Sequence, residues 1–254
     1  MVATSVTVEA VRDVGPDTIA LELRTPAGFD ALPGQFVLIR AVPGGGDEDG
    51  DGGEDVDGGG EDGDGGEDAV EEVDTVEEGD AADAAESEAV ARHYTLASPG
   101  VGETFELTVG VDPDGDLSPW LAEREPGDEL HVEGPFGTIT YEGDVDVVAV
   151  AGGPGVGAAV AVAEAAHEAG HGAAVVYQDD EPAHLERLER LEAAGVPVSI
   201  LDVGDDEGLA RAISQHVDDG QLYAFGFTDF VTVVANAIED AGADPDEAHI
   251  ENFG

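Results

Sequence analysis

The residues best suited to chemistry in this 254-residue chain form one tetrapeptide, Arg92-His93-Tyr94-Thr95. An extended strand would project Arg92 and Tyr94 to the same face. A guanidinium binds phosphate through its fork of donors, an aromatic ring packs on a flat ring, and a hydroxyl hydrogen-bonds a ring nitrogen. This set suits a flavin nucleotide, although the tetrapeptide alone also fits an ordinary strand with a surface arginine.

Two further motifs follow the tetrapeptide in a fixed order. The first is Gly115-Asp116-Leu117-Ser118-Pro119-Trp120-Leu121 and the second is Gly134-Pro135-Phe136-Gly137. Together the three resemble the FAD-binding signature of the ferredoxin-NADP reductase family, in which Arg-x-Tyr-Ser/Thr precedes Gly-x-x-Ser/Thr-x-x-Leu and a Gly-Pro-Phe-Gly turn. The resemblance continues to the C-terminal residues and implies an FAD-binding barrel followed by a domain that binds NAD(P).

The resemblance implies a role for each residue of the flavin signature. It places Arg92 at the FAD pyrophosphate, Tyr94 at the isoalloxazine and ribityl groups, and Thr95 within hydrogen-bonding reach of flavin N5. Gly115 precedes the one helix of the barrel, so the backbone N–H groups of Leu117 and Ser118 would point at the pyrophosphate. Ser118 also fits a plain helix N-cap, and the two roles are compatible.

A glycine-rich turn, Gly152-Gly153-Pro154-Gly155-Val156-Gly157, follows an apolar run and precedes a small-residue helical pattern. In that context a turn brings backbone amides onto a dinucleotide pyrophosphate, which predicts Gly152, Gly153 and Gly155 as cofactor-binding residues. The family usually has Thr where this chain has Pro154. Because proline lacks an N–H, the nicotinamide site departs from the family pattern.

The family also implies the sites that surround the nicotinamide. Relatives have Cys-Gly-Pro where this chain has Phe225-Gly226-Phe227, so Gly226 is retained in the cofactor-binding set and the thiol is absent. Glu251 and Phe253 match the family's Glu-x-Phe motif, in which the carboxylate lies near the reacting ring and the aromatic covers the flavin. Thr95, Glu251 and Phe253 are therefore the expected catalytic residues, and an exposed strand is the alternative for the last two.

Acidic residues also bear on which nicotinamide nucleotide is used. Asp179 and Asp180 stand where NADP-selective relatives commonly have Arg or Ser. A carboxylate there opposes a 2'-phosphate, so NAD is weakly preferred to NADP. In the barrel, FAD is the expected flavin and FMN is the alternative.

Alternation of apolar and polar residues predicts how these motifs are positioned. Six short strands and one helix over 118–125 predict a small antiparallel barrel within residues 1–142. Apolar strands that alternate with helices predict a doubly wound parallel α/β domain over 143–254. The predicted strands are 5–11, 18–24, 35–39, 93–98, 104–111 and 129–133 in the first domain, and 145–150, 172–177, 198–202, 221–225 and 248–251 in the second.

The charge composition excludes several partners and indicates the environment. The chain has 60 acidic residues, eight Arg and no Lys, with a formal net charge of -52. Such a surface repels nucleic acid and anionic lipid, and it indicates adaptation to very high salt, where self-repulsion is screened. We expect a cytoplasmic protein, because residues 1–11 lack the basic region of a signal peptide and the glycines interrupt the apolar run at 147–163.

Residues 44–91 predict a disordered acidic insertion, because they contain no basic residue and almost no large apolar side chain. Asp47, Asp49 and Asp51 resemble the start of an EF-hand loop, but Gly58 occupies the position of the terminal ligand. No metal site is expected elsewhere, since the seven His lack ligand spacing and Cys is absent.

These residues predict an enzyme that moves a hydride between NAD(P)H and FAD and then electrons to a separate carrier such as ferredoxin. With no Cys, the chain itself cannot hold a cysteine-ligated cluster. Two alternatives remain open: a flavin electron-transfer subunit that uses no nicotinamide, and a non-catalytic regulator that binds flavin or nucleotide.

Overall fold

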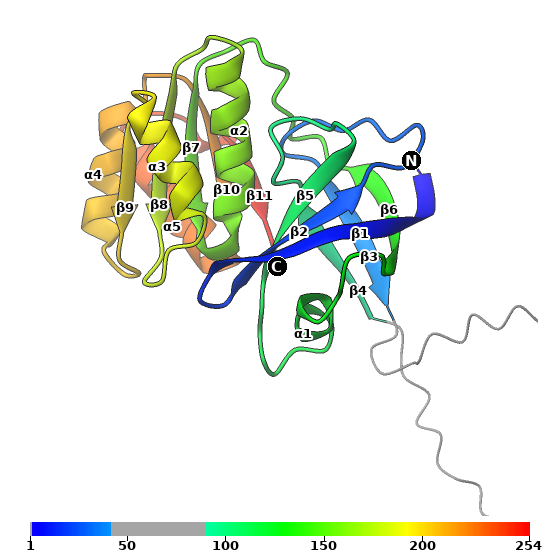
Figure 1. Ribbon diagram of the computed structural model, residues 1–254. Coiled ribbons are helices and arrows are strands. Elements are labelled where there is room, and N and C mark those ends of the chain that lie inside the picture. The colour runs from blue at the N-terminus through cyan, green and yellow to red at the C-terminus, as the bar shows by residue number, and fades with distance from the viewer. Residues whose placement is uncertain (1, 42–89) are drawn as a thin grey trace, which may run out of the picture. The chain divides into compact units, whose positions relative to one another are not determined.

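The computed structural model describes residues 2–41 and 90–254 (Figure 1). The predicted insertion at 44–91 lies outside the described residues, except for its last two. Those two, Val90 and Ala91, belong to strand β4. The strand begins three residues before its predicted start at 93, because its pairing with β3 continues to the Ala41–Val90 pair, and it ends at Thr95, before its predicted end at 98.

The first half of the described chain is an antiparallel six-stranded sheet in the order β4-β3-β6-β1-β2-β5. Its two edge strands meet at a bridge between Leu96 and Leu107, which closes the sheet into a barrel. A short helix, α1, lies in the connection from β5 to β6 (Figure 1). The elements are β1 (Val2–Gly15), β2 (Thr18–Arg24), β3 (Phe36–Ala41), β4 (Val90–Thr95), β5 (Thr104–Gly110), α1 (Leu117–Ala122) and β6 (Glu129–Phe136).

Alternating burial along the strands builds the barrel core. Leu21 and Leu23 of β2 are fully buried, as is Leu107 of β5, and α1 contributes Leu117 and Leu121 to the same cluster. Burial of a side chain of this size contributes about 1.5–3 kcal/mol. The period-2 pattern seen in the sequence therefore has its ordinary cause, with one face of each strand packed inside the barrel.

The second half is a parallel five-stranded sheet in the order β11-β10-β7-β8-β9. The order reverses between β7 and β10, which is where doubly wound folds bind ligands. Its elements are β7 (Val147–Gly152), η1 (Gly153–Gly155), α2 (Val156–Glu168), β8 (Ala173–Gln178), α3 (Leu185–Ala193), β9 (Val198–Leu201), α4 (Asp206–His216), β10 (Gln221–Gly226), α5 (Thr228–Asp240), η2 (Pro245–Glu247) and β11 (His249–Asn252).

Helices cover both faces of this sheet. Ala149 and Ala151 of β7 pack in one cluster with residues of α2 and α3, whereas Val148 and Val150 pack in another with residues of α4 and α5. A strand covered on both faces needs no polar alternation, so β7 reads as an uninterrupted apolar run. Among the described residues, no helix is both long and apolar enough to span a bilayer.

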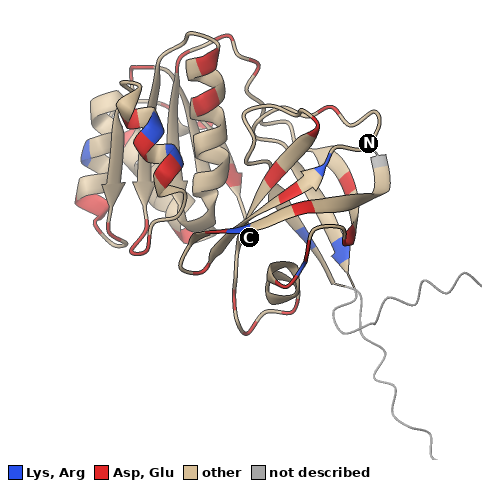
Figure 2. Cartoon of the chain, viewed as in Figure 1, with Lys and Arg blue, Asp and Glu red and all other residues tan. Residues whose placement is uncertain are grey.

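The predicted fold class is confirmed: an antiparallel six-stranded barrel followed by a doubly wound parallel sheet. Two local expectations were wrong. Gly134, Pro135 and Phe136 do not form a separate turn but end strand β6, where Phe36 of β3 pairs with Phe136. The barrel helix ends at Ala122, before the turn that leads through Pro126, and does not reach residue 125. Figure 2 shows acidic residues on strands, helices and loops of both halves, with fewer basic residues among them.

Candidate functional site

A cavity of about 510 Å³ gathers most of the residues that the flavin signature singled out. Its volume lies in the range of ordinary ligand sites. Seven predicted site residues line it, namely Arg92, Tyr94, Thr95, Gly115, Leu117, Ser118 and Phe253. Its lining comes from β4, β5, the start of α1, the glycine-rich turn and the tail after β11, so segments far apart in sequence converge here.

Arg92 supplies the only guanidinium of this cavity lining. It lies on β4, is exposed, and donates a hydrogen bond from Nη1 to the Ala91 carbonyl at 2.9 Å. It forms no ion pair with any residue in the described parts of the chain, although five of the other arginines do. The five paired arginines are Arg12, Arg24, Arg40, Arg124 and Arg187.

Tyr94 and Thr95 bring two hydroxyl groups to the same cavity. Burial raises the pKa of Tyr94 to about 12, with Arg92 opposing the shift, so its hydroxyl remains protonated at neutral pH. Within 2–41 and 90–254, neither hydroxyl has a hydrogen-bond partner. Both are therefore free to donate to, or accept from, a bound molecule.

The loop before α1 forms another wall. The Ser118 hydroxyl accepts a hydrogen bond from the Asp112 backbone N–H at 3.1 Å, and Gly115 N–H donates to the Asp112 carbonyl at 2.9 Å. Ser118 thus closes the loop with its side chain, and its own backbone N–H belongs to the first turn of a helix, where such groups lack intrahelical partners. A side chain at Gly115 would lie 3.2 Å from the Asp112 carbonyl oxygen, so the closed loop favours glycine.

The electrostatics of the cavity are unusual for a site that would take phosphate. Four carboxylates line it, from Asp17, Asp112, Asp116 and Asp179, against the single guanidinium of Arg92. An anionic ligand therefore meets a net repulsion from the fixed charges. At molar salt the Debye length falls to about 3 Å, which screens the more distant carboxylates while leaving a direct contact to Arg92 in place.

The glycine-rich turn contributes Pro154, but not the predicted glycines, to the cavity lining. Packing accounts for two of these glycines. A Cβ at Gly152 would lie 2.5 Å from the Phe230 ring, and a Cβ at Gly155 would overlap the Phe225 carbonyl. Gly153 has a φ of 55° with open space beyond its Cα, so its constraint is conformational. Their role in nucleotide binding stays a prediction.

Two neighbouring residues at the carboxyl end of β8 are held differently. Asp179 lines the cavity, where its carboxylate accepts hydrogen bonds from the Tyr177 hydroxyl at 2.8 Å and the Glu181 N–H at 2.9 Å. Burial raises the pKa of Tyr177, which therefore remains a donor. Asp180 instead accepts from the Val203 N–H at 2.8 Å. Of the two predicted acidic residues, only Asp179 reaches the cavity.

A buried amide donor next to the glycine-rich turn has no partner. Gln178 is 7% exposed and pairs with Gly152 in the sheet, and its Nε2 finds no acceptor among the described residues. Buried polar groups are normally hydrogen-bonded, so this one is open to a ligand or a water molecule.

At the C-terminal side, Phe253 lines the cavity, and its ring packs edge to face against the ring of Phe227 with the ring centroids 5.9 Å apart. Phe227 also lines the cavity and is 53% exposed. Phe225, which stands where relatives have the Cys, does not line the cavity: it is fully buried and packs beside Tyr223. Alternation along the strand turns Phe225 into the core, and the chain leaves the strand before Phe227.

Glu251 and Gly226 do not line the cavity. Glu251 pairs with Phe225 in the sheet, is half-buried, and burial raises the pKa of its carboxyl group. A Cβ at Gly226 would lie 2.6 Å from the Phe230 ring, so this glycine also makes room for an aromatic side chain. The predicted catalytic and cofactor roles of these two residues stay predictions.

Sequence reasoning gave no site role to several residues of the lining, among them Thr108, Pro154 and Phe227. Thr108 lies inside a strand and Phe227 and Pro154 are departures from the family pattern. Pro154 and Phe227 could have been found from the sequence, because each stands beside a glycine of a family motif and differs from the residue that the family has there. Thr108 had none, since a threonine in an alternating strand is ordinary.

Comparison with known proteins agrees with this arrangement. Residues 81–141 match the family model of the oxidoreductase FAD-binding domain. The chain is 45% identical over 76 residues to the glycine betaine monooxygenase reductase subunit of Chromohalobacter salexigens, covering 28% of this chain and 20% of that protein. It is 27% identical over 190 residues to the flavohemoprotein of Pseudomonas aeruginosa, covering 66% of this chain and 48% of that protein. It thus spans about a fifth and about half of these two curated relatives.

Among solved structures, the ferredoxin reductase in carbazole 1,9a-dioxygenase aligns over all of this chain and 70% of its own length. The TM-score is 0.70 at 20% sequence identity. At that sequence identity the match supports the fold alone, so the function has to be inferred from the residues of the cavity.

Proposed function

We propose that this chain, whose residues 81–141 match the oxidoreductase FAD-binding domain, transfers a hydride from NAD(P)H to FAD and passes electrons singly to a separate redox protein. FAD supplies the conversion between two-electron and one-electron chemistry when bound. The chain's own residues would bind and orient the two nucleotides in the 510 Å³ cavity.

The observation that carries this proposal is the arrangement of Arg92, Tyr94 and Thr95. The guanidinium has no carboxylate partner among the described residues, and the two hydroxyls next to it are also unpaired. Such groups fit a ligand with phosphate, a flat ring and ring nitrogens. Arg92 would hold the pyrophosphate, Tyr94 the ribityl and ring region, and Thr95 the edge of the ring that reacts.

The nicotinamide nucleotide would enter from the side formed by the parallel sheet. Pro154, Asp179 and Phe227 line that side of the cavity. The carboxylate of Asp179, held in place by Tyr177, opposes a 2'-phosphate and supports a weak preference for NADH. Phe253 and Phe227 would limit access to the ring, and Glu251 would act from the sheet edge nearby.

A second candidate is a flavin electron-transfer subunit that uses no nicotinamide. Pro154 favours it, because a proline in the glycine-rich turn removes a backbone donor that a pyrophosphate could use. Exposed Phe227 beside Phe253 favours it too, since both rings occupy the entrance that nicotinamide needs. In this case the electron donor would also be a separate protein.

An anaerobic absorbance titration in molar salt separates the two candidates. The FAD-reconstituted protein is mixed with NADH, with NADPH and, as a control, with dithionite. Bleaching of the flavin by either nucleotide supports hydride transfer. Bleaching by dithionite alone refutes it in favour of the nicotinamide-independent carrier, and failure to bind FAD or FMN refutes both.

A further inference from the structure

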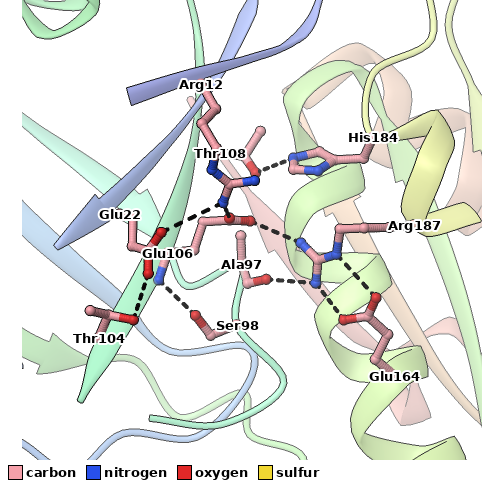
Figure 3. A network of polar contacts seen from close by, with 10 residues as sticks. All are labelled: Arg12, Glu22, Ala97, Ser98, Thr104, Glu106, Thr108, Glu164, His184 and Arg187. Carbon is pink, nitrogen blue, oxygen red and sulfur yellow. Dashed lines mark hydrogen bonds and ion pairs between the residues drawn. The ribbon is translucent and has the colours of Figure 1, made fainter. Parts of the chain in front are cut away.

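A polar network joins the barrel to the parallel sheet, and Arg187 lies at its centre (Figure 3). From the first turn of α3, its guanidinium binds both carboxylate oxygens of Glu164 on α2, at 3.1 and 2.6 Å. It also donates to Glu106 on β5 at 3.0 Å and to the Ala97 carbonyl at 2.9 Å. The Arg187, Glu106 and Glu164 side chains are only 12%, 14% and 18% exposed, so water does not replace these bonds easily.

The two barrel groups that Arg187 contacts lie where the barrel closes. The Ala97 N–H donates to the Glu106 carbonyl at 2.7 Å, next to the Leu96–Leu107 bridge. Ala97 also lies two residues after Thr95, which lines the cavity. Arg187 therefore ties an element of the parallel-sheet half to the backbone that carries the proposed flavin contacts.

His184 makes a parallel connection just before α3. Its Nε2 lies 2.8 Å from the Thr108 hydroxyl (Figure 3). Its backbone N–H donates to the Val14 carbonyl at 2.8 Å. Thr108 lines the cavity, two residues after Glu106 on the same strand. Residues at the start of α3 thus contact β5 at Glu106 and at Thr108, and Thr108 lines the cavity.

Only arginine can make the central set of contacts. Its planar fork reaches a bidentate carboxylate, a second carboxylate and a carbonyl together, whereas a lysine ammonium is a point charge on a flexible stem. Arg12 of β1 also pairs with Glu106, so that carboxylate keeps a cation even without Arg187. Glu164 has no other ion pair within the described residues. Loss of Arg187 therefore has two separable consequences: an unpaired Glu164 and a lost bond to Ala97.

We propose that Arg187 is a positioning residue for hydride transfer, because it holds the parallel-sheet half in one placement on the flavin-facing backbone of the barrel. The inference rests on the proposed function, since it requires nicotinamide and flavin to be presented by the two halves. A misplacement of about 1 Å can slow a reaction of this kind about a hundredfold. Arg187 itself need not touch either nucleotide.

The test compares Arg187→Gln, the double variant Arg187→Gln/Glu164→Gln, and Arg190→Gln. Arg190 is the matched control: it lies on α3, is exposed, and forms no ion pair with a described residue. Three quantities are measured in molar salt: the thermal midpoint, amide hydrogen exchange of residues 95–110 in the apoprotein, and the rate of flavin reduction at saturating NADH by rapid mixing.

We expect Arg187→Gln to lower the midpoint, to speed exchange at 95–110, and to slow flavin reduction about tenfold to a hundredfold at unchanged flavin content. The double variant should regain the midpoint, because no carboxylate is left unpaired, while exchange and reduction stay altered. Arg190→Gln should match the wild type in all three.

Recovery of the reduction rate in the double variant would show that Arg187 only neutralises Glu164, and would overturn the inference. Wild-type exchange and wild-type reduction in Arg187→Gln would overturn it as well. If neither NADH nor NADPH reduces the wild-type flavin, the proposed function is refuted, and the role of Arg187 in it is refuted as well. Rapid flavin reduction in the wild type with slow reduction in Arg187→Gln supports both the proposed function and the role of Arg187.

Discussion

Arg92 offers the most direct test of the flavin site. Replacing Arg92 with Ala removes the only guanidinium in the cavity lining without breaking an ion pair among the described residues. Charge-assisted hydrogen bonds contribute about 1.5–3 kcal/mol, and because Arg92 is exposed we discount this for solvent screening to about 1–2 kcal/mol. This corresponds to a loss of about five- to thirtyfold in FAD affinity.

Quenching of flavin fluorescence on titration of the apoprotein measures that affinity. Arg92→Lys should bind FAD with intermediate affinity, since it keeps the charge and loses the fork. Arg211→Ala is the matched control, because Arg211 is exposed on α4 and does not line the 510 Å³ cavity. An Arg92→Ala protein that binds FAD as tightly as the control would refute the assignment of Arg92 to phosphate.

Salt provides a second arm of the same experiment. Four carboxylates and one guanidinium line the cavity, so the fixed charges repel an anionic ligand. FAD affinity of the wild type should therefore rise as salt increases toward molar concentration and the repulsion is screened. A fall in affinity over that range would show that attraction to Arg92 outweighs the carboxylates, contrary to the electrostatic reasoning.

Three further predictions concern nucleotide choice, access and pH. Asp179→Asn should lower the ratio of kcat/KM for NADH to kcat/KM for NADPH, because it removes a carboxylate that lines the cavity and opposes the 2'-phosphate of NADPH. An unchanged ratio would count against a role of Asp179 in nucleotide choice. Phe253→Ala should tighten nicotinamide binding by opening the entrance beside Phe227, measured as a lower apparent Kd in rapid mixing; equal binding in both proteins would exclude a lid. Burial, aided by Arg187, lowers the pKa of His184 from 6.5 to about 3, so the unfolded chain binds a proton between these values that the folded chain refuses. This contribution to the free energy of unfolding is complete above pH 6.5 and is lost as the pH falls toward 3, by at most about 1.4 kcal/mol per pH unit. The free energy of unfolding of His184→Gln, measured with denaturant, should therefore depend less on pH over that range than that of the wild type.

Much of the fold was predictable because each half has a repeating local pattern. The range 18–24 was predicted as a strand and is strand β2, since a surface of alternating residues closes over the barrel core. The apolar run before the glycines became β7 because both of its faces are covered by helices. Boundaries were less accurate, as at the end of α1 and at Gly134-Pro135-Phe136, because they depend on neighbouring strands and turns.

The candidate site was predictable where one local segment supplies several contacts. Arg92, Tyr94 and Thr95 are neighbours in sequence, so a single strand carries them into the cavity together. The nicotinamide side was less predictable, because it combines residues from separate turns. There the choice between Phe225 and Phe227 depended on which side chain the end of β10 directs outward.

The sequence by itself determined the two-part architecture, the tetrapeptide at 92–95 that lines the cavity, and the absence of lysine and cysteine, because each of these depends on local order or composition. Only the tertiary structure decided that Asp179 reaches the cavity while Asp180 binds the Val203 N–H, and that Phe227 and not Phe225 lines the cavity. It also decided that Arg187 binds the carbonyl of a residue 90 positions earlier. Contacts of this kind depend on how packed elements meet, and no pattern of neighbouring residues specifies the direction of a side chain across such a distance.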